Sequence, residues 1–454
     1  MKRIMSILSF ALLLSANDNS MSMTHALSLN EALELLQSQN LEIKAAKLDE
    51  KSAQEQVQSV SGMNWGKLTF TQDAARSNDA GNVFGFKLTS REATFGDFGF
   101  AEFSMTNPNI LKVEPKDLNY PGYRNFYQSK LKYEVPLFTG FAISSYTNIM
   151  QEMKKIKSLD KEQVMTEKSY ELRKSFYDMA LLDSSIKNLN KILYNIETLE
   201  NTTQTMIEVG YAKKVDLLEV KAKKGNVERL LVQMKANQKL LYHYISFLLN
   251  KKVDNIMLPA SEVPMPNLTD KEVLSRNIDI QKATTALEIR KSMLDANEAA
   301  YYPTVGAFGE VATADDTFLG DASDHKAYTV GARLTWNIFN GGIDSAKIEQ
   351  AKIEKMKMHT QVELAKKGIA LKVAKIRTEI ESQNAQIASL EKELALANAI
   401  YENYEGRYKE KLVSMSDVII KQSAQIEKIL QLQMAKNKRT EKIFELEKIA
   451  NGDK

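Results

Sequence analysis

The side chains that could bind a metal or transfer a proton are few and scattered in this sequence. Its four histidines, His25, His243, His325 and His359, are far apart, and no two of them have metal-ligand spacing. Cysteine is absent, which excludes disulfides, thiolate metal sites and a cysteine nucleophile. We therefore expect surface or hydrogen-bonded histidines, and we predict no metal site.

Sequence motifs for enzymatic chemistry are also missing. Neither a P-loop nor a dinucleotide fingerprint occurs, and no serine, aspartate or glutamate stands in a recognisable nucleophile motif. The 61 basic and 58 acidic residues leave a net charge of +3, without a basic run dense enough to follow a phosphate backbone. The sequence predicts a protein that is not an enzyme, uses no cofactor and binds no nucleic acid.

Two aspartates, Asp216 and Asp417, follow breaks in long helical segments. Gly210 interrupts the first segment, and the break in the second falls near Lys411, 201 positions later. An acidic side chain in the first turn of a helix interacts favourably with the positive end of the helix dipole. We therefore expect each aspartate at the start of a returning helix, and Glu219, one turn after Asp216, on a solvated face.

The helical segments around these breaks are unusually long. No proline occurs between Pro136 and Pro259 or after Pro303. Apolar residues recur at alternating steps of three and four, which is typical of a coiled-coil seam. The clearest runs are Leu182, Ile186, Leu189, Leu193 and Ile196, and Ile387, Leu390, Leu394, Ala397, Tyr401, Tyr404 and Tyr408. A helix over residues 141–208 would be about 100 Å long.

Each long helix is preceded by a segment in which apolar and polar residues alternate, as in a strand with one apolar face. The two segments are YQSKLKYEVPLFTG (127–140) and YTVGARLTWNIFNGG (328–342). In the second, the alternation predicts a strand over residues 328–338. The residues that we expect on the apolar, lipid-facing side are Leu131, Tyr133, Val135, Val330, Leu334 and Trp336.

The sequence contains an internal duplication. Residues 40–46 match residues 277–283 at an offset of 237, whereas Phe138 matches Phe339 at an offset of 201, so the first half is longer by about 36 residues. We predict a first repeat over 27–258, with an insertion at 74–126, a linker at 259–267 and a second repeat over 268–454. The repeats open with helical segments at 29–62 and 268–300. The aromatic-rich insertion is either a surface loop or extra strand material.

The first 26 residues are predicted to be a secretory signal peptide. Lys2 and Arg3 precede an apolar run at 4–14, which is too short for a bilayer helix but suits a signal core. Cleavage after Ala16 or after Ala26 fits the pattern. We therefore expect an exported protein.

Four strands cannot close a membrane barrel, which needs at least about eight. No other strand-rich region could cover the apolar strand faces, so we expect several chains to share one barrel, with apolar faces toward lipid and polar faces toward a lumen. The expected fold class is mainly α with β. It combines long antiparallel coiled-coil helices with a transmembrane β-barrel that several chains share, each contributing four strands.

The order of several segments resembles the TolC-like outer-membrane efflux protein family. These segments are LSLNEALELLQSQN (27–40), VPLFTGF, VGYAKKVDLLEV (209–220), Tyr-Tyr-Pro before a strand, and WNIFNGG. The resemblance implies a homotrimer. Its fold would join a long antiparallel coiled-coil α-helical barrel, as a tunnel in the periplasm, to a trimer-shared transmembrane β-barrel of 12 strands, four per chain, in the outer membrane. The resemblance also implies two partners, a periplasmic adaptor (membrane fusion) protein and an inner-membrane pump or ABC exporter. The protein would then be the passive exit duct of a tripartite efflux pump or a type I secretion system.

The resemblance also suggests site residues near the helix breaks and strand ends. Asp216, Asp417 and Tyr408 match the periplasmic gate, although Val413 and Ile420 replace an arginine and a second aspartate of the prototype. The other candidates are helix-tip residues for adaptor contact and strand-to-helix junction residues: Gly210, Tyr211, Lys411 and Leu412, and Phe138, Gly140, Phe339 and Gly341. The alternative is a periplasmic coiled-coil adaptor or scaffold, but two duplicated helical hairpins favour the duct.

Overall fold

The computed structural model describes residues 26–259, 262–318, 320 and 324–451. The predicted signal peptide lies outside the described residues, apart from Ala26. The chain divides into two compact units, and we describe each by itself. The first holds the described residues up to 47, those of 161–278 and those from 367 onward, and the second holds 48–160 and the described residues of 279–366.

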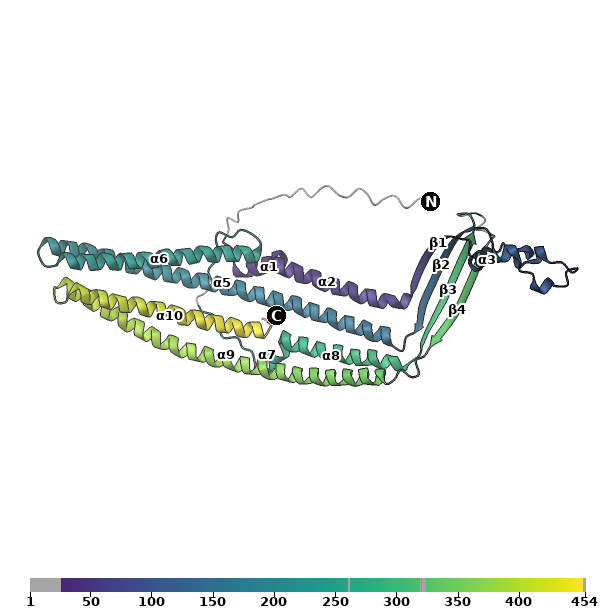
Figure 1. Cartoon of the computed structure of the whole chain (residues 1–454). Coiled ribbons are helices and arrows are strands. Elements are labelled where there is room, and N and C mark those ends of the chain that lie inside the picture. The colour runs from purple at the N-terminus through teal and green to yellow at the C-terminus, as the bar shows by residue number, and fades with distance from the viewer. Residues whose placement is uncertain (1–25, 260–261, 319, 321–323, 452–454) are drawn as a thin grey trace. The chain divides into compact units, whose positions relative to one another are not determined.

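The same order of elements occurs twice along the chain, as Figure 1 shows. Each half has two opening helices, two strands, a helix of 67 residues and a returning helix. The first half contains α1 (Leu29–Gln39), α2 (Leu41–Gly62), β1 (Lys67–Ser77), β2 (Arg124–Phe138), α5 (Ala142–Glu208) and α6 (Lys214–Leu249). The second contains α7 (Asp270–Arg276), α8 (Ile278–Glu298), β3 (Thr304–Asp315), β4 (Lys326–Thr335), α9 (Ile343–Lys409) and α10 (Met415–Ile449). No helix in the described part of the chain is both long and apolar enough to cross a membrane.

The opening helical segment of each half is broken at one asparagine, where we had predicted a continuous helical segment. At Asn40 the backbone turns extended (ψ 130°), and the side-chain Oδ1 accepts a hydrogen bond from Ile43 N–H, which starts α2. The Nδ2 group donates to the Leu248 carbonyl at 2.8 Å. Asn277 repeats this arrangement, with its Nδ2 donating to the Ile449 carbonyl at 3.0 Å. Each asparagine therefore ties an opening helix to the end of the returning helix of its half.

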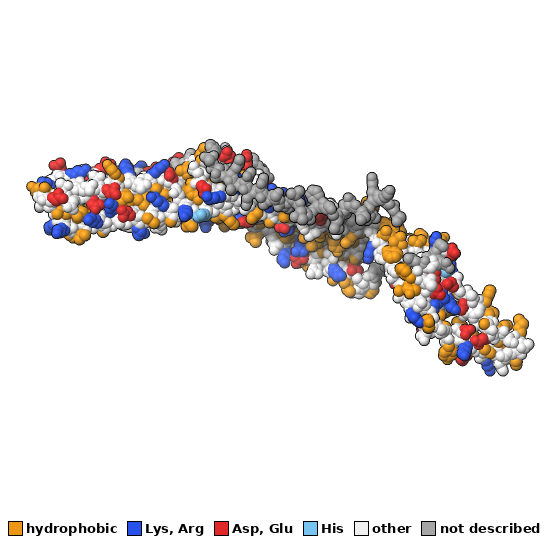
Figure 2. Space-filling model, turned by 90° about the horizontal axis from the view of Figure 1, so that it is seen from above, with side chains coloured by type: hydrophobic (Ala, Val, Ile, Leu, Met, Phe, Trp, Pro, Cys, Tyr) orange, Lys and Arg blue, Asp and Glu red, His pale blue; other side chains and the backbone are white. Residues whose placement is uncertain are grey.

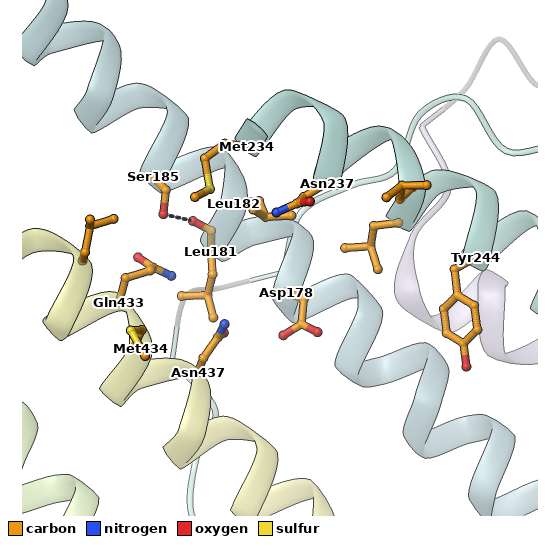
Figure 3. Close-up of a pocket in the computed structure, with 13 residues that line it drawn as sticks. Asp178, Leu181, Leu182, Ser185, Met234, Asn237, Tyr244, Gln433, Met434 and Asn437 are labelled. Carbon is orange, nitrogen blue, oxygen red and sulfur yellow. Dashed lines mark hydrogen bonds between the residues drawn. The ribbon is translucent and has the colours of Figure 1, made fainter. Parts of the chain in front are cut away.

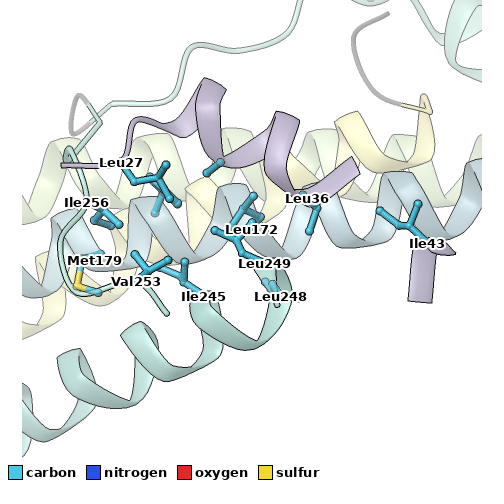
Figure 4. Close-up of a cluster of buried hydrophobic side chains, with 12 residues drawn as sticks. Leu27, Leu36, Ile43, Leu172, Met179, Ile245, Leu248, Leu249, Val253 and Ile256 are labelled. Carbon is cyan, nitrogen blue, oxygen red and sulfur yellow. The ribbon is translucent and has the colours of Figure 1, made fainter. Parts of the chain in front are cut away.

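The core of the first unit consists of three clusters of buried apolar side chains between helices. Figure 4 shows the cluster in which α1 and the start of α2 pack against α5 and the end of α6, with Leu36, Ile43 and Leu172 among its members. A second cluster joins α5 and α6 to α9 and α10 and contains the seam residues Leu189 and Ile196, which are fully buried. The coiled-coil spacing therefore predicted which faces are buried.

The second unit contains one antiparallel sheet with the order β1-β2-β3-β4. The strand that we predicted at 328–338 ends earlier, because β4 stops at Thr335, paired with Thr304 at the start of β3. The residue before Thr304 is Pro303, which has no N–H to continue the ladder. Trp336 lies just beyond the strand, and its indole N–H donates to the Tyr301 carbonyl at 3.2 Å.

The connection between β1 and β2, residues 78–123, is built from short helices and turns and not from extra strands. It contains α3 (Ala80–Thr89), α4 (Lys116–Asn119) and the 3₁₀ turns η2 (Phe95–Phe98), η3 (Phe100–Glu102) and η4 (Ile110–Lys112). Phe86 stacks on Phe126 of β2, with ring centroids 4.3 Å apart. Many other apolar side chains of the connection are exposed. Figure 2 shows hydrophobic surface on this segment, which lies at the right-hand end of the view.

Candidate functional site at the helix tips

Two tight turns reverse the long helices in the first unit, and their backbones match. In the α5–α6 turn Gly210 has φ 82°, and in the α9–α10 turn Lys411 has φ 64°. The next N–H in each turn reaches back five residues, from Tyr211 to the Met206 carbonyl at 2.7 Å and from Leu412 to the Arg407 carbonyl at 2.8 Å. This is the hydrogen bond with which a left-handed residue closes a helix C-terminus. Both predicted breaks therefore lie in these turns.

Asp216 and Asp417 cap the returning helices. The Asp216 carboxylate accepts a hydrogen bond from Lys213 N–H at 2.8 Å. The Asp417 carboxylate accepts bonds from the hydroxyl and N–H of Ser414, at 2.6 and 3.1 Å, while Ser414 Oγ accepts from Asp417 N–H. These bonds from Ser414 hold the pKa of Asp417 below its usual range. Each carboxylate thus stabilises the first turn of its own helix, as the dipole argument predicted.

Several side chains join one tip to the other. The Lys411 ammonium lies 3.3 Å from the centre of the Tyr211 ring, a cation–π contact between the two turns. One turn below, the Tyr408 hydroxyl lies 3.4 Å from Thr203 Oγ1 on α5. The structure therefore brings together three of the predicted tip and gate residues, Tyr211, Lys411 and Tyr408, in contacts between the α5–α6 and α9–α10 pairs.

Further contacts between the tips involve residues that sequence reasoning missed. Glu219 does not lie on a purely solvated face, because its carboxylate accepts a hydrogen bond from Ser416 Oγ at 2.7 Å. Lys223 Nζ donates to Ser423 Oγ at 2.7 Å, and burial lowers the pKa of this lysine. The partners stand 197 and 200 positions apart, close to the repeat offset of 201. At an offset of 201 itself, Glu219 and Lys223 correspond to Ile420 and Ala424, so the repeat alone would not have found these polar pairs.

The packing beneath the tips is apolar around two tyrosines. Tyr401 and Tyr408 are buried in the cluster shared by α5, α6, α9 and α10. Burial raises the pKa of both phenols, and the negative charge of Asp216 also raises that of Tyr408. Tyr211 and Leu412, by contrast, are 65% and 66% exposed. The turns thus combine a fixed interior with accessible apolar side chains.

A pocket of about 600 Å³ lies further along the same helices, between α5, α6 and α10. Figure 3 shows Leu181, Leu182 and Met234 beside the amides of Asn237 and Asn437. Asp178 also lines it, and burial raises the pKa of this carboxyl group although Lys174 Nζ lies 3.0 Å away. Leu240 and Met434 leave most of their side-chain surface exposed at its edge.

In the second unit the strand register gathers the predicted lipid-facing residues of β2 and β4 on one face of the sheet; Trp336 lies beyond the end of β4. Leu68, Tyr133, Gly309 and Val330 align across the four strands, as do Phe70, Leu131, Val311 and Tyr328. Val330 is 77% and Leu334 63% exposed, whereas Val135 is half-buried. A single chain thus leaves a broad apolar sheet face uncovered.

The opposite face of the sheet is charged. Lys132 pairs with Glu134 at 2.8 Å, and Lys130 on β2 pairs with Glu310 on β3 at 3.5 Å. Arg333 of β4 lies over the Phe308 ring, 6.0 Å from its centre. The two faces therefore differ in the way that separates a lipid-facing from a water-facing surface.

The strand-to-helix junctions depend on left-handed residues. Gly140 has φ 60°, and a Cβ there would lie 2.7 Å from the Ala299 carbonyl oxygen, so no other residue fits without movement. Phe138 contacts Phe141 edge to face at 5.4 Å. In the second junction Gly341 has φ 69° and Phe339 is 82% exposed.

Comparisons with known proteins give consistent results. A family model described as outer membrane efflux protein matches residues 32–250 and 271–452. The putative multidrug resistance outer membrane protein MdtQ of Escherichia coli (strain K12) is 27% identical over 177 residues, and the match spans 37% of this chain and 37% of that protein.

Solved structures extend the similarity to almost the whole chain. The structure of CusC has a TM-score of 0.77 at 14% identity and covers 94% of this chain and 92% of its own. The open state of the Neisseria gonorrhoeae MtrE outer membrane channel has a TM-score of 0.74 at 15% identity and covers 93% and 89%. At such identities the likeness concerns the fold, and it confirms the expected class of long helices with a four-stranded antiparallel sheet.

Proposed function

Because the chain belongs to the outer membrane efflux protein family, we propose that it is a passive exit duct through the outer membrane, opened at its helix tips. The observation that carries the proposal is the sheet, which has one exposed apolar face and one charged face. Such a sheet suits a barrel wall between lipid and water. The duct would serve a tripartite efflux pump or a type I secretion system.

Family membership confirms two of the sequence predictions. The protein is an outer-membrane protein, and it belongs to a family of channels that are not enzymes. The expected recognition as a TolC-like efflux protein is likewise confirmed.

In the proposed assembly three chains share one barrel. Four strands per chain give twelve in a homotrimer, which exceeds the minimum of about eight for a closed membrane barrel. Closure would pair β1 of one chain with β4 of the next and remove both free sheet edges. Leu131, Tyr133 and Val330 would then face lipid.

The pocket described above, between α5, α6 and α10, supports contact with a neighbouring copy of the chain. Its lining contains five leucines and two methionines beside the amides, and Leu240 and Met434 leave apolar surface exposed. Apolar residues in coiled-coil positions are normally covered by another helix. We propose that a helix of the adjacent subunit in the trimer covers this pocket.

The gate of the duct, in this proposal, is closed by the contacts between the two tips. The Lys411–Tyr211, Tyr408–Thr203 and Ser416–Glu219 contacts hold α9–α10 against α5–α6. Asp216 and Asp417 support the closed form by capping the helices that carry these contacts. The accessible Tyr211 and Leu412, beside Gly210 and Lys411, would be the surface that a periplasmic adaptor engages.

Native mass and conductance test the proposal. After detergent extraction from outer membranes we expect a mass near three times the 51.3 kDa chain, corrected for detergent and for the signal peptide. The same material should form pores in planar bilayers. A monomer or dimer that leaves the membrane in high salt, without pore activity, would refute the duct and favour a periplasmic scaffold.

A further inference from the structure

One group of potential metal ligands in the described part of the chain lies far from the helix tips in sequence. Glu92 comes from the β1–β2 connection, Asp315 is the last residue of β3, and His325 directly precedes β4. One ligand atom from each of these side chains lies within 4.8 Å of the other two. Asp315 is buried, and the other two are half-buried. The sequence could not reveal this group, because its members are separated by up to 233 positions.

Neighbouring groups orient each of the three side chains. His325 Nδ1 lies 3.2 Å from the Ala314 carbonyl oxygen and 3.9 Å from Asp315 Oδ2. Thr317 donates to Asp315 Oδ1 from its N–H at 3.2 Å. Metal sites in proteins typically have such outer contacts, which fix the direction of each ligand.

The Glu92 carboxylate is held through one of its two oxygens. Ser90 Oγ donates to Glu92 Oε2 at 2.6 Å, and the Arg124 guanidinium pairs with the same oxygen. A carboxylate can bind a guanidinium through one oxygen and a cation through the other. Arg124 therefore positions Glu92 without occupying the whole carboxylate.

The local charge balance favours a divalent cation. Glu92, Asp315 and Asp316 are carboxylates. Arg124 pairs with Glu92 and, through its second guanidinium nitrogen at 3.5 Å, with Asp316. Counted formally, three carboxylates and one guanidinium leave an excess of two negative charges. One divalent ion would compensate that charge.

We propose that Glu92, Asp315 and His325 bind a divalent transition-metal ion, of which Zn²⁺ is the best match. Zinc accepts imidazole nitrogen and carboxylate oxygen together, often as three protein ligands with one water. Calcium takes six to eight oxygens, and magnesium also prefers oxygen, so neither suits this set. Ligand distances near 2.1 Å require the three side chains to close in slightly on the ion.

The ion would have a structural role. Glu92 belongs to the hairpin of the first half, whereas Asp315 and His325 flank the hairpin connection of the second half. A bound ion would fasten the β1–β2 connection to the ends of β3 and β4, in addition to the Arg124 contacts. Through this link it would order the connection at residues around Glu92.

The test measures zinc binding by the full-length protein in detergent, made without a histidine tag and stripped with a chelator. Calorimetry with ZnCl₂ should give one ion per chain, and CaCl₂ should give no comparable binding. His325→Ala and the nearly isosteric Asp315→Asn should each weaken binding at least about 100-fold. The control His243→Ala removes an exposed imidazole from α6 and should leave binding unchanged.

Hydrogen exchange provides a second readout that does not depend on channel activity. Zn²⁺ should slow exchange of backbone amides around Glu92 and His325 in the wild type and not in His325→Ala. The proposal is overturned if the wild type binds no zinc, if His325→Ala and Asp315→Asn bind as tightly as the wild type, or if zinc leaves those amides unaffected.

Discussion

The cation–π contact between the two helix tips gives the sharpest test of the proposed gate. Lys411→Ala removes the ammonium that lies over Tyr211, and Tyr211→Leu removes the ring but keeps an apolar side chain. Alanine and lysine both carry a Cβ, so the strain of the positive φ at position 411 is the same in both. The substitution therefore reports on the contact and not on the backbone.

The expected size of the effect follows from exposure and symmetry. Tyr211 is 65% exposed, and cation–π contacts at exposed sites contribute about 0.5–1 kcal/mol. If opening breaks the contact in all three chains of a trimer, the closed state loses about 1.5–3 kcal/mol. This corresponds to an increase of about 10- to 150-fold in the ratio of open to closed channels.

Single-channel recording in planar bilayers measures this ratio. Each single variant should raise open probability, and the double variant should add little more, because both changes remove the same contact. Lys411→Arg retains a cation and should resemble the wild type. Lys409→Ala removes a nearby charge that pairs with Glu405 and should have little effect. Fully additive single variants, or an equal effect of Lys409→Ala, would refute the gate contact.

Three other predictions concern the asparagines that join the helices, the apolar sheet face and the buried phenol of Tyr408. Asn40→Ala and Asn277→Ala should each lower the free energy of unfolding by about 1–3 kcal/mol, because each removes the side-chain donor to a carbonyl at the end of a returning helix. Denaturant titration measures this, with Asn190→Ala, a change at an exposed position, as the control. Val330→Lys on the apolar sheet face should destabilise the membrane-inserted trimer by up to about 2–4 kcal/mol, whereas Thr329→Lys on the opposite face should be tolerated. Urea unfolding from lipid vesicles measures this, and equal losses of unfolding free energy in the two variants would contradict the face assignment. The raised pKa of Tyr408 favours the neutral phenol in the proposed closed tip, so its stabilisation of that state is complete below pH 10 and is lost as the pH rises above 10. Open probability should therefore increase above pH 10, and less so in Tyr408→Phe. An identical pH dependence of the two proteins would show that Tyr408 does not contribute to the gate.

Long-range periodicity predicted most of the fold. Alternation at positions 127–138 placed Leu131 and Tyr133 on one face of β2, and the three-and-four spacing placed Leu189 and Ile196 in a helix seam. These predictions succeed because burial on one face imposes its period directly on the sequence. The duplication then located the second break at Lys411 from the glycine at 210.

The features that escaped prediction depend on single residues or on tertiary contacts. Asn40 breaks a helical pattern because its side chain bonds to the Leu248 carbonyl, a partner 208 positions away. The early end of β4 depends on its neighbour strand, which begins only after Pro303. The tip contact of Glu219 and the group around His325 likewise join segments distant in sequence. Periodicity carries no information on such pairings.

The two tip turns share one backbone form but differ in stiffness. Glycine enters both left- and right-handed regions at little cost, whereas a left-handed lysine is about 1–2 kcal/mol above its preferred state. The α5–α6 turn therefore has little backbone strain at Gly210. The α9–α10 turn is strained at Lys411 as long as the φ of this residue stays at 64°. The hydrogen bond from Leu412 N–H to the Arg407 carbonyl closes this turn, while the Lys411 side chain lies over Tyr211. One residue of the α9–α10 turn thus carries both a strained backbone and a contact to the α5–α6 turn.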